Sequence, residues 1–260
     1  MVLVSVVLVV KNEAKRIEAC IEAVKGWADE IIVCDDGSTD TTVKIAQSYG
    51  AKVVLNPNVT IEGAKRNWAY SNAKNDWVFS IDADEIVTEP IKKEIDTVLP
   101  DTEHTCFSVP NKVYIGNYWI RWGGWYPSAK VKLFRKSKFK YEESDVHPRI
   151  FTEGSCGHLK KDILHYSYRD WFDFLDKTNK QTTLEAKKWY RVFNEDPKKA
   201  KKKMNFLHAL WRTFDRFVRA YIFKKGYKDG FTGFVLAYYG SLYQLTSYAK
   251  YRELIEKSAG

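Results

Sequence analysis

The sequence has no run of apolar residues long enough to cross a membrane. Its longest apolar opening, Val2–Val10, falls short of the roughly 20 residues that a bilayer requires, and no later stretch reaches that length. The N-terminus also lacks the basic leader and the small-residue cleavage site of a signal peptide. We therefore expect the chain to be made and kept in the cytoplasm.

Cysteine is scarce, and the sequence has neither an internal repeat nor a low-complexity linker. The four cysteines, Cys20, Cys34, Cys106 and Cys156, show no CxxC spacing, so we interpret them as reduced residues that fill apolar space. Aromatic residues make up 15% of the chain, which argues against disorder. The 260 residues suffice for one large domain or two modest ones with a real core.

The net charge of +9 is unevenly distributed along the chain. From Trp171 onward there are 19 Lys and Arg against 9 Asp and Glu, a net of +10. The remainder has 42 − 19 = 23 basic and 33 − 9 = 24 acidic residues, a net of −1. A basic C-terminal part on a nearly neutral body indicates contact with a membrane, a nucleic acid or an acidic ligand.

Strand-like and helix-like segments alternate in the N-terminal part of the chain. Strands are predicted over residues 2–10, 30–34, 52–55 and 77–81, and helices over residues 41–49 and 63–73. A further helix is predicted after Asn12, which we expect to cap it. This alternation is typical of an α/β sheet with right-handed crossovers. Short aromatic segments over residues 105–169 predict antiparallel strands, and a helical pattern begins at Trp171.

Three polar segments follow predicted strands: VVKNEA after the first, DDGSTD after the second and DADE after the fourth. Helix capping explains any one of them. Because α/β sheets bind ligands at the carboxyl ends of their strands, all three together predict a binding site at that edge.

The DADE segment, with Asp82, Asp84 and Glu85, has the character of a site for a hard metal ion. Carboxylates this close repel each other unless something positive lies between them. Mg²⁺ and Mn²⁺ take oxygen ligands, few of them from the protein, and complete their shell with water and phosphates. The alternative is a solvated turn before a helix over residues 90–98, whose N-terminus Glu85 and Glu89 would favour.

The motifs SVVLVVKNEA, WADEIIVCDDGSTDTTVKIAQSYGAKV, GAKRNWA and WVFSIDADEIV resemble the nucleotide-sugar domain of family 2 glycosyltransferases, which have the GT-A fold. The later motifs GGWYPSAKVKLFRK, VHPRI and ILHYSYRDW, with the segment beginning GYKDGF, are similar to the bacterial lipopolysaccharide-core β-1,4-glucosyltransferase branch. The resemblance implies a GT-A-type α/β sheet with helices on both faces and a C-terminal helical extension. It divides the chain into a nucleotide-sugar half (1–104), an acceptor-side half (105–170) and a basic helical extension (171–260).

The resemblance also assigns donor and metal roles. It implies Asp36 at the base edge, Val9 lining the base pocket, Glu13 near the ribose, Lys65 and Arg66 facing the diphosphate, Asp82 near the ribose and metal, and Asp84 on the metal. For Lys65 and Arg66, an exposed helix face is the alternative. Such a site suits the chemistry, because a divalent ion and nearby cations stabilise the charge that develops on a leaving nucleoside diphosphate.

Inversion at the sugar further requires a carboxylate that takes the acceptor's proton. The candidates lie in YEESDVHPRI, where Asp145 is our first choice and Glu143 our second. The sequence departs from the family here, since members often carry an acid directly after the histidine and this chain has Pro148. A hairpin rich in solvated acids is the alternative for this segment.

Four more residues are candidates for contacts to the acceptor or to phosphate. His147 and His165 could complete the metal shell or orient the acceptor, although a lone histidine is more often structural. Trp125 and Lys132 are expected to shape the sugar pocket, with plain core packing as the alternative for Trp125.

The C-terminal part carries an apolar stripe beside three arginines. The stripe comprises Trp211, Phe214, Phe217, Val218, Tyr221 and Ile222, and the arginines are Arg212, Arg216 and Arg219. Such a helix suits a membrane interface, and it equally suits a cap packed on the catalytic domain.

We therefore expect an inverting glycosyltransferase that depends on Mg²⁺ or Mn²⁺. It would move a hexose, glucose in the first place, from a UDP-linked donor to a saccharide or glycolipid such as the lipopolysaccharide inner core. It would act in the cytoplasm, peripherally on the cytoplasmic face of the inner membrane. Transfer to a polyprenyl phosphate is the second enzyme hypothesis, and a non-catalytic glycan- or nucleic-acid-binding protein is the alternative from another class. Nucleic acid is not expected as a partner, because neither a stacking strand platform nor a helix-turn-helix is evident.

Overall fold

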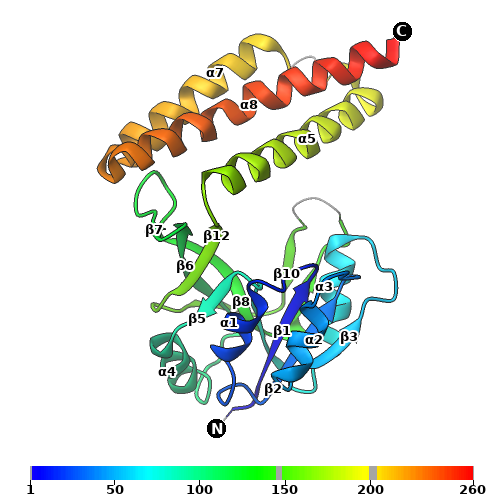
Figure 1. Cartoon of the computed structure of the whole chain (residues 1–260), viewed down its shortest axis with the longest axis vertical. Coiled ribbons are helices and arrows are strands. Elements are labelled where there is room, and N and C mark those ends of the chain that lie inside the picture. The colour runs from blue at the N-terminus through cyan, green and yellow to red at the C-terminus, as the bar shows by residue number, and fades with distance from the viewer. Residues whose placement is uncertain (1, 145–147, 199–203, 260) are drawn as a thin grey trace. The chain divides into compact units, whose positions relative to one another are not determined.

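A computed structural model describes residues 2–144, 148–198 and 204–259. The chain forms two compact units (Figure 1). The first comprises Met1–Lys112 and Ser128–Ser167, and the second comprises Val113–Pro127 and Tyr168–Gly260. Each unit is described by itself.

The first unit is built on a parallel sheet with crossover helices. Its elements are, in chain order, β1 (Val4–Val10), α1 (Ile17–Glu22), β2 (Glu30–Asp35), α2 (Thr42–Ser48), β3 (Lys52–Leu55), α3 (Glu62–Ser71) and β4 (Trp77–Ser80). β1 pairs in parallel with both β2 and β4, and β2 pairs in parallel with β3. The strands and helices predicted for this part of the sequence are confirmed. The strands could be recognised because continuous β-branched runs are typical of strands buried on both faces.

Further strands, from two to ten residues long, continue this sheet. They are β5 (Glu85–Val87), β6 (Cys106–Ile115), β7 (Tyr118–Trp119), β8 (Ser128–Arg135), β11 (Cys156–His158) and β12 (Ile163–Tyr168), with helix α4 (Glu89–Val98) between β5 and β6. The order is β3-β2-β1-β4-β8-β6-β12-β5, while β7 and β11 both pair with β6. β9 (Phe139–Tyr141) and β10 (Ile150–Thr152) form a separate pair. The predicted antiparallel strands are confirmed, except that β11 runs parallel to β6.

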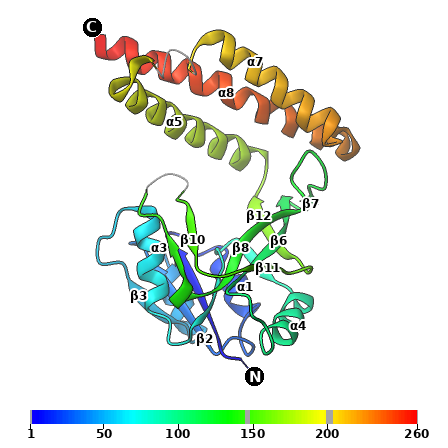
Figure 2. The same ribbon diagram turned by 180° about the vertical axis from the view of Figure 1, so that it is seen from behind.

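Helices cover both faces of the sheet, as Figures 1 and 2 show. Alternate residues of β1 enter different apolar clusters, since Leu8 packs in the cluster that includes Ile17 of α1 and Ile91 of α4, whereas Val7 packs with Tyr70 of α3. All five are at most 3% exposed. The period-two alternation of a strand thus assigns α1 and α4 to one face and α3 to the other.

The second unit is helical. It consists chiefly of α5 (Trp171–Glu195), α7 (Phe206–Val218), a π-helical turn η2 (Arg219–Phe223), a 3₁₀ turn η3 (Gly226–Asp229) and α8 (Gly230–Ala259). α8 packs against both α5 and α7. Asp170 caps α5 through the amide of Asp173 at 2.8 Å, and Asn205 caps α7 through the amide of His208 at 2.9 Å. Among the described helices, none has the length and apolar character needed to span a bilayer.

Candidate active site

Three polar segments meet at the carboxyl edge of the parallel strands. β1 and β2 end together, with Val10 opposite Asp35, and the amide of Ile81 just past β4 donates to the carbonyl of Val7 at 3.2 Å. The edge predicted from the sequence as the site therefore exists, and it brings the ends of β1, β2 and β4 side by side.

Asn12 ties two of these segments together rather than capping a helix, so the predicted cap is wrong. α1 begins at Ile17, and Asn12 has a positive φ of 56°. Its Oδ1 accepts from the amide of Thr39 at 2.8 Å, while its own amide donates to Ser38 Oγ at 2.9 Å. Asparagine tolerates this left-handed conformation. Its side-chain oxygen and its backbone amide together link the loop after β1 to the loop after β2.

The DADE segment forms a tight turn between β4 and β5. The amide of Glu85 donates to the carbonyl of Asp82 at 2.9 Å, and the Glu85 carboxylate accepts in return from the amide of Asp82 at 2.9 Å. Glu85 is fully buried, which excludes the solvated-turn alternative for this residue. The helix α4 begins only at Glu89.

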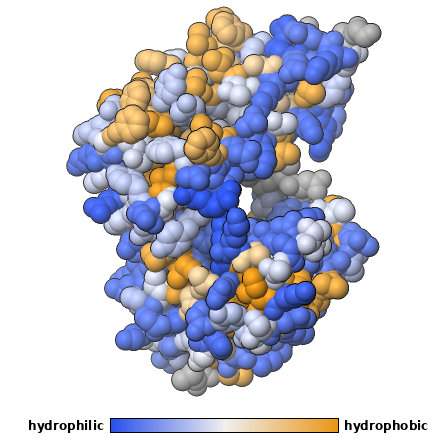
Figure 3. Space-filling view, in the orientation of Figure 1, coloured by the Kyte–Doolittle hydropathy of each residue, from blue (hydrophilic) through white to orange (hydrophobic). Residues whose placement is uncertain are grey.

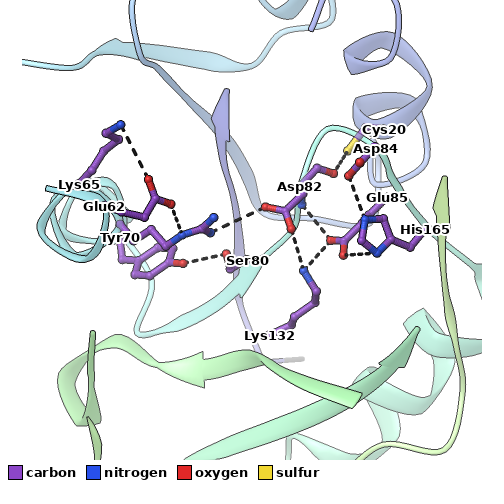
Figure 4. A network of polar contacts seen from close by, with 11 residues as sticks. Cys20, Glu62, Lys65, Tyr70, Ser80, Asp82, Asp84, Glu85, Lys132 and His165 are labelled. Carbon is purple, nitrogen blue, oxygen red and sulfur yellow. Dashed lines mark hydrogen bonds and ion pairs between the residues drawn. The ribbon is translucent and has the colours of Figure 1, made fainter. Parts of the chain in front are cut away.

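Lys132 of β8 neutralises the buried side of this turn (Figure 4). Its Nζ lies 2.6 Å from Glu85 Oε2 and 3.4 Å from Asp82 Oδ2. Arg66 of α3 lies on the other side of Asp82, with Nη1 3.7 Å from Oδ1.

The electrostatics of this cluster follow from that arrangement. Lys132 above all, with help from Arg66, holds the pKa of Asp82 well below its usual range despite burial. Burial raises the pKa of Glu85 even though Lys132 opposes the shift. Burial alone would lower the pKa of Lys132, but the two carboxylates raise it above its ordinary value. Asp82 and Lys132 are therefore both charged.

Asp84 contacts a different pair of basic side chains. Its Oδ2 lies 3.4 Å from Arg16 Nη1, and its Oδ1 lies 3.4 Å from His165 Nε2. His165 comes from β12, where it is paired with Glu85 of β5, and the amide of Tyr166 donates to the Asp84 carbonyl at 2.9 Å. The antiparallel β5–β12 pair thus fixes the backbone and the side chain of Asp84 together.

The donor set of the turn fits a divalent ion. Asp82 and Asp84 offer carboxylate oxygens, and Glu85 Oε1 is a buried oxygen without a hydrogen bond. Over the part of the chain that the structure describes, no three His, Cys, Asp or Glu side chains form a complete metal cage. Mg²⁺ and Mn²⁺ need only one or two carboxylates when water and phosphate oxygens supply the rest.

Asp36 forms a second charged centre at the same edge, just after β2. Its Oδ2 lies 2.7 Å from Lys65 Nζ, and its Oδ1 accepts from Asn56 Nδ2 at 2.5 Å. Partial burial acts to raise the pKa of Asp36, but the hydrogen bonds from Lys65 and Asn56 outweigh it and lower that pKa. Val9, half-buried on β1, and Glu13 come from the segment that the Asn12 crosslink joins to this loop.

A pocket of about 540 Å³ connects several predicted residues. Arg66, Asp82, Lys132 and Pro148 line it, together with Tyr141. Lys65 instead points to Asp36 (Figure 4 shows it beside Glu62). The two basic residues of GAKRN therefore contact different carboxylates.

The segment with the base candidates packs on the start of α3. The amide of Gly63 donates to the carbonyl of Ser144 at 3.2 Å, and a Cβ at position 63 would lie 1.8 Å from the carbonyl oxygen of Glu142. Glu143 is exposed, with Oε1 3.2 Å from Lys140 Nζ. The predicted site residues Asp145 and His147 lie outside the described residues.

Trp125 belongs to the second unit. It packs beside Tyr168, with ring centroids 6.2 Å apart, and lines a pocket of about 270 Å³ with Trp122, Arg216 and Lys224. Trp125 is partly buried and packs against the apolar cluster that contains Phe174, so its position also fits the core-packing alternative.

Neither Glu85 nor Arg16 was assigned a site role of its own from the sequence, in which Glu85 appeared only as part of the DADE segment and as a residue favouring a helix N-terminus. Glu85 lies directly beside Asp84 in the sequence, yet its burial against Lys132 depends on β5, a strand of only three residues. A usable signal was Lys132 itself, a charged residue inside the apolar run VKLF. Arg16 gives no such signal, because a basic residue before a helix is most often solvated.

Comparisons with known proteins define the class. The model of glycosyl transferase family 2 matches residues 5–164, more than half of the chain. The chain belongs to this family and is a glycosyltransferase. The expected α/β fold of GT-A type with C-terminal helices is confirmed.

Glycosyltransferases of Rickettsia and Rhizobium are similar to this chain over different shares of its length. An uncharacterized glycosyltransferase of Rickettsia typhi is 30% identical over 98% of this chain and 88% of its own length. The lipopolysaccharide core biosynthesis glycosyltransferase LpsC of Rhizobium meliloti is 26% identical over 95% of this chain and 90% of its own. Another relative, from Rickettsia bellii, is 47% identical, but the match spans only 32% of that protein.

Among solved structures, glucosyl-3-phosphoglycerate synthase of Mycobacterium tuberculosis is 30% identical over 43% of this chain and 44% of its own, with a TM-score of 0.36. It was crystallised with Mn²⁺, uridine diphosphate and glucosyl-3-phosphoglycerate.

Proposed function

We propose that the chain is an inverting, metal-dependent hexosyltransferase that moves glucose from a UDP-linked donor to a saccharide acceptor of the lipopolysaccharide-core kind. The observation that carries this proposal is the acidic turn Asp82–Glu85, which lies with Asp36 at one sheet edge and is surrounded by cations. The similarity to LpsC supports the acceptor class.

The donor would lie along this edge. Asp36 would accept from the base, with Val9 lining the base pocket and Glu13 near the ribose. The charge on Asp36, which Lys65 and Asn56 maintain, suits hydrogen bonds from an uracil N–H group. Among the described residues, Lys65 and Asn56 hold its carboxylate, so a bound base would compete with the Asn56 amide for one oxygen.

The diphosphate would lie against the pocket that Arg66, Asp82 and Lys132 line. Asp82 and Asp84 would hold Mg²⁺ or Mn²⁺, which supplies positive charge to the leaving diphosphate. Arg66 adds a fixed positive charge at the same pocket, and Lys65, which contacts Asp36 Oδ2, adds a second positive charge at the same edge of the sheet. Such preorganised charge stabilises the transition state without reorganisation.

The acceptor side rests on the segment after β9. Asp145 would take the proton from the acceptor hydroxyl, with Glu143 as the second candidate. Residues 142–144, which precede Asp145 in the chain, pack on the start of α3, the helix that carries Glu62 and Arg66. His147, His165, Trp125 and Lys132 would contact the acceptor or phosphate.

The reaction would take place in the cytoplasm, at the inner leaflet where a glycolipid acceptor is anchored. The net charge of +10 from Trp171 onward favours such an anionic surface. A polyprenyl phosphate is the other acceptor that this site would accommodate, and nucleic acid is not expected as a partner.

Thermal unfolding with UDP, GDP and ADP, each with and without Mn²⁺, tests the donor and the metal. A ligand that binds only the native state raises its stability by about 2.7 kcal/mol at a hundred times its dissociation constant. We expect a response to UDP that requires Mn²⁺ and that Asp36→Ala weakens. Indifference to every nucleotide would refute the proposal. Labelled UDP-glucose offered with core oligosaccharide or with polyprenyl phosphate then identifies the acceptor.

A further inference from the structure

The hairpin of α7 and α8 carries a large exposed apolar surface. It comprises Leu207, Leu210, Trp211 and Phe214 of α7, Ile222, Phe223 and Tyr227 of the connecting turns, and Phe231, Phe234 and Tyr238 of α8. We call this surface the hairpin face. Its most exposed members, Leu207, Phe223 and Phe231, are 73–77% exposed. None of its residues has a role in the proposed transfer reaction.

The hairpin face is continuous across both helices. The ring of Phe234 contacts those of Phe217 on α7 and Tyr221 on η2, with centroids 6.0 and 5.7 Å apart, and stacks on Tyr238 at 6.1 Å. An open groove of about 750 Å³ runs between the helices, with Trp211 and Leu242 among its walls. Figure 3 shows hydrophobic residues gathered over this part of the helical unit.

Packing inside the helical unit buries only part of the apolar stripe that the sequence shows. Phe217, Val218 and Tyr221 are half-buried, whereas Trp211, Phe214 and Ile222 are 50–63% exposed. Monomeric proteins rarely leave contiguous apolar surface of this size in water, and where they do it marks a binding surface.

The charges around the hairpin face are almost all positive. Residues 206–242 contain six basic side chains, Arg212, Arg216, Arg219, Lys224, Lys225 and Lys228, and two acidic ones. Asp229 is buried and accepts from the amides of Arg121 and Trp122 at 3.1 and 2.8 Å. Asp215 pairs with Arg219 at 2.7 Å. Within residues 206–242, both carboxylates are therefore engaged elsewhere, and neither balances the exposed lysines of the turns.

We propose that the hairpin face lies on an anionic lipid surface, with its rings and leucines in the interfacial layer and Lys224, Lys225 and Lys228 on lipid phosphates. Tryptophan and tyrosine favour the headgroup level, and lysine stems lie along apolar surface while their ammonium groups reach the phosphates. A second copy of this chain would bring the same cations face to face, which costs free energy. A nucleic acid would leave Leu207, Leu210 and Ile222 without a partner.

Flotation of the full-length protein with vesicles tests the apolar part. We expect binding to vesicles of three parts phosphatidylcholine and one part phosphatidylglycerol, and weaker binding to phosphatidylcholine alone. Trp211→Glu with Phe214→Glu should lower the partition coefficient at least ~10-fold, because the helix loses apolar area and gains repulsion. The matched control is Phe172→Glu with Leu184→Glu, which makes the same charge change at exposed apolar residues of α5 and should retain binding.

The lysines are tested separately. Near an anionic surface each contributes about 1 kcal/mol, so Lys224→Ser with Lys228→Ser should weaken binding to the phosphatidylglycerol vesicles about 30-fold. The control, Lys187→Ser with Lys188→Ser, removes the same charge from exposed positions of α5 and should change binding little. Raising the salt concentration should weaken the wild type in the same way.

Three results would overturn the proposal. The first is failure of the wild type to float with either vesicle, and the second is equal binding by the hairpin-face variants and their controls. The third is a wild type that is dimeric in light scattering while the Trp211→Glu, Phe214→Glu variant is monomeric. The last would assign the face to a second copy. Because UDP-dependent thermal shifts should persist in every variant, failure here is distinguishable from failure of the proposed transfer reaction.

Discussion

Asp82 and Asp84 are two positions apart, yet they contact different basic side chains. Asp82 lies between Lys132 and Arg66, whereas Asp84 lies between Arg16 and His165. The repulsion expected between neighbouring carboxylates is thus met by side chains from four different elements of the fold. A divalent ion at this turn would take over part of a charge balance that the protein already maintains.

Asp84→Asn should lower kcat at least ~10²-fold, because the amide keeps the shape of the side chain but removes the charge that a divalent ion requires. The turn is fixed by backbone hydrogen bonds, so the thermal midpoint should change little. Steady-state kinetics at saturating Mn²⁺ measures kcat, and circular dichroism measures the thermal midpoint. Asp101→Asn, at an exposed position, is the control. Full activity in the Asp84 variant would remove this residue from the metal site.

Lys132→Met should destabilise the fold by about 3–5 kcal/mol, since it leaves buried Glu85 without its cation. Urea unfolding measures the change. Adding Glu85→Gln should recover part of the loss, because the uncompensated charge is then gone. Saturating Mn²⁺ should also recover part of it by supplying positive charge to the turn. A single variant as stable as the wild type would show that Lys132 is not needed to neutralise the turn.

Residue chemistry was predictable where a motif stands alone, and unpredictable where a partner comes from far along the chain. The acidic and basic residues of DDGS, GAKRN and DADE are visible in the sequence. The pairing of Glu85 with Lys132, and of Asp84 with His165, depends on β8 and β12 folding against β4 and β5, which no local pattern specifies. Asn12 was predicted to cap a helix because asparagine is a common cap, but its side chain instead accepts a hydrogen bond from the loop after β2.

At the scale of elements, the long strands and helices follow from their sequences. β1, β2 and β4 are continuous apolar runs, and the stripe of α7 has helical spacing. β5 has only three residues and β7 only two, so neither carries enough periodicity to be recognised. Their positions are fixed by partners, which is why the turn before β5 could not be predicted.

The contact between α3 and residues 142–144 gives a prediction of its own. Gly63→Ala should displace this segment, because the new Cβ would collide with the backbone carbonyl of Glu142. If the base lies on this segment, kcat should fall at least ~10-fold while UDP affinity, measured by calorimetry, stays within a factor of about three. Gly240→Ala, in an open position of α8, is the control and should behave as wild type. Unchanged kcat in the Gly63 variant would separate the segment from the chemistry.

The base itself is tested by two isosteric changes. Asp145→Asn should lower the rate by ~10²–10⁴ while donor affinity stays near normal, which is the usual contribution of general base catalysis. Glu143→Gln should have little effect, since Glu143 is exposed and paired with Lys140. The reverse pattern would transfer the role to Glu143. Normal rates in both variants would place the base outside this segment.

On the scale of the whole molecule, the two units have separate cores. The apolar clusters around Leu8 and Val7 lie entirely in the first unit, and those around Phe174 and Trp189 lie entirely in the second. Calorimetry should therefore show UDP with Mn²⁺ raising the transition of the first unit and leaving that of the second in place. A single transition that shifts as a whole would show that the units unfold together.

The pairing of β5 with β12 also has a consequence for how the chain acquires its structure during synthesis. Val87 is opposite Ile163, which leaves the ribosome 163 − 87 = 76 residues later. β4 likewise pairs with a strand that is synthesised much later, since Trp77 is opposite Arg135 of β8. Non-local pairing of this kind is slow, because a long loop must close before any contact rewards it. The strands that flank the acidic turn therefore find their partners late in synthesis. Until then the edges of β4 and β5 are unpaired, and unpaired edges favour aggregation and chaperone binding.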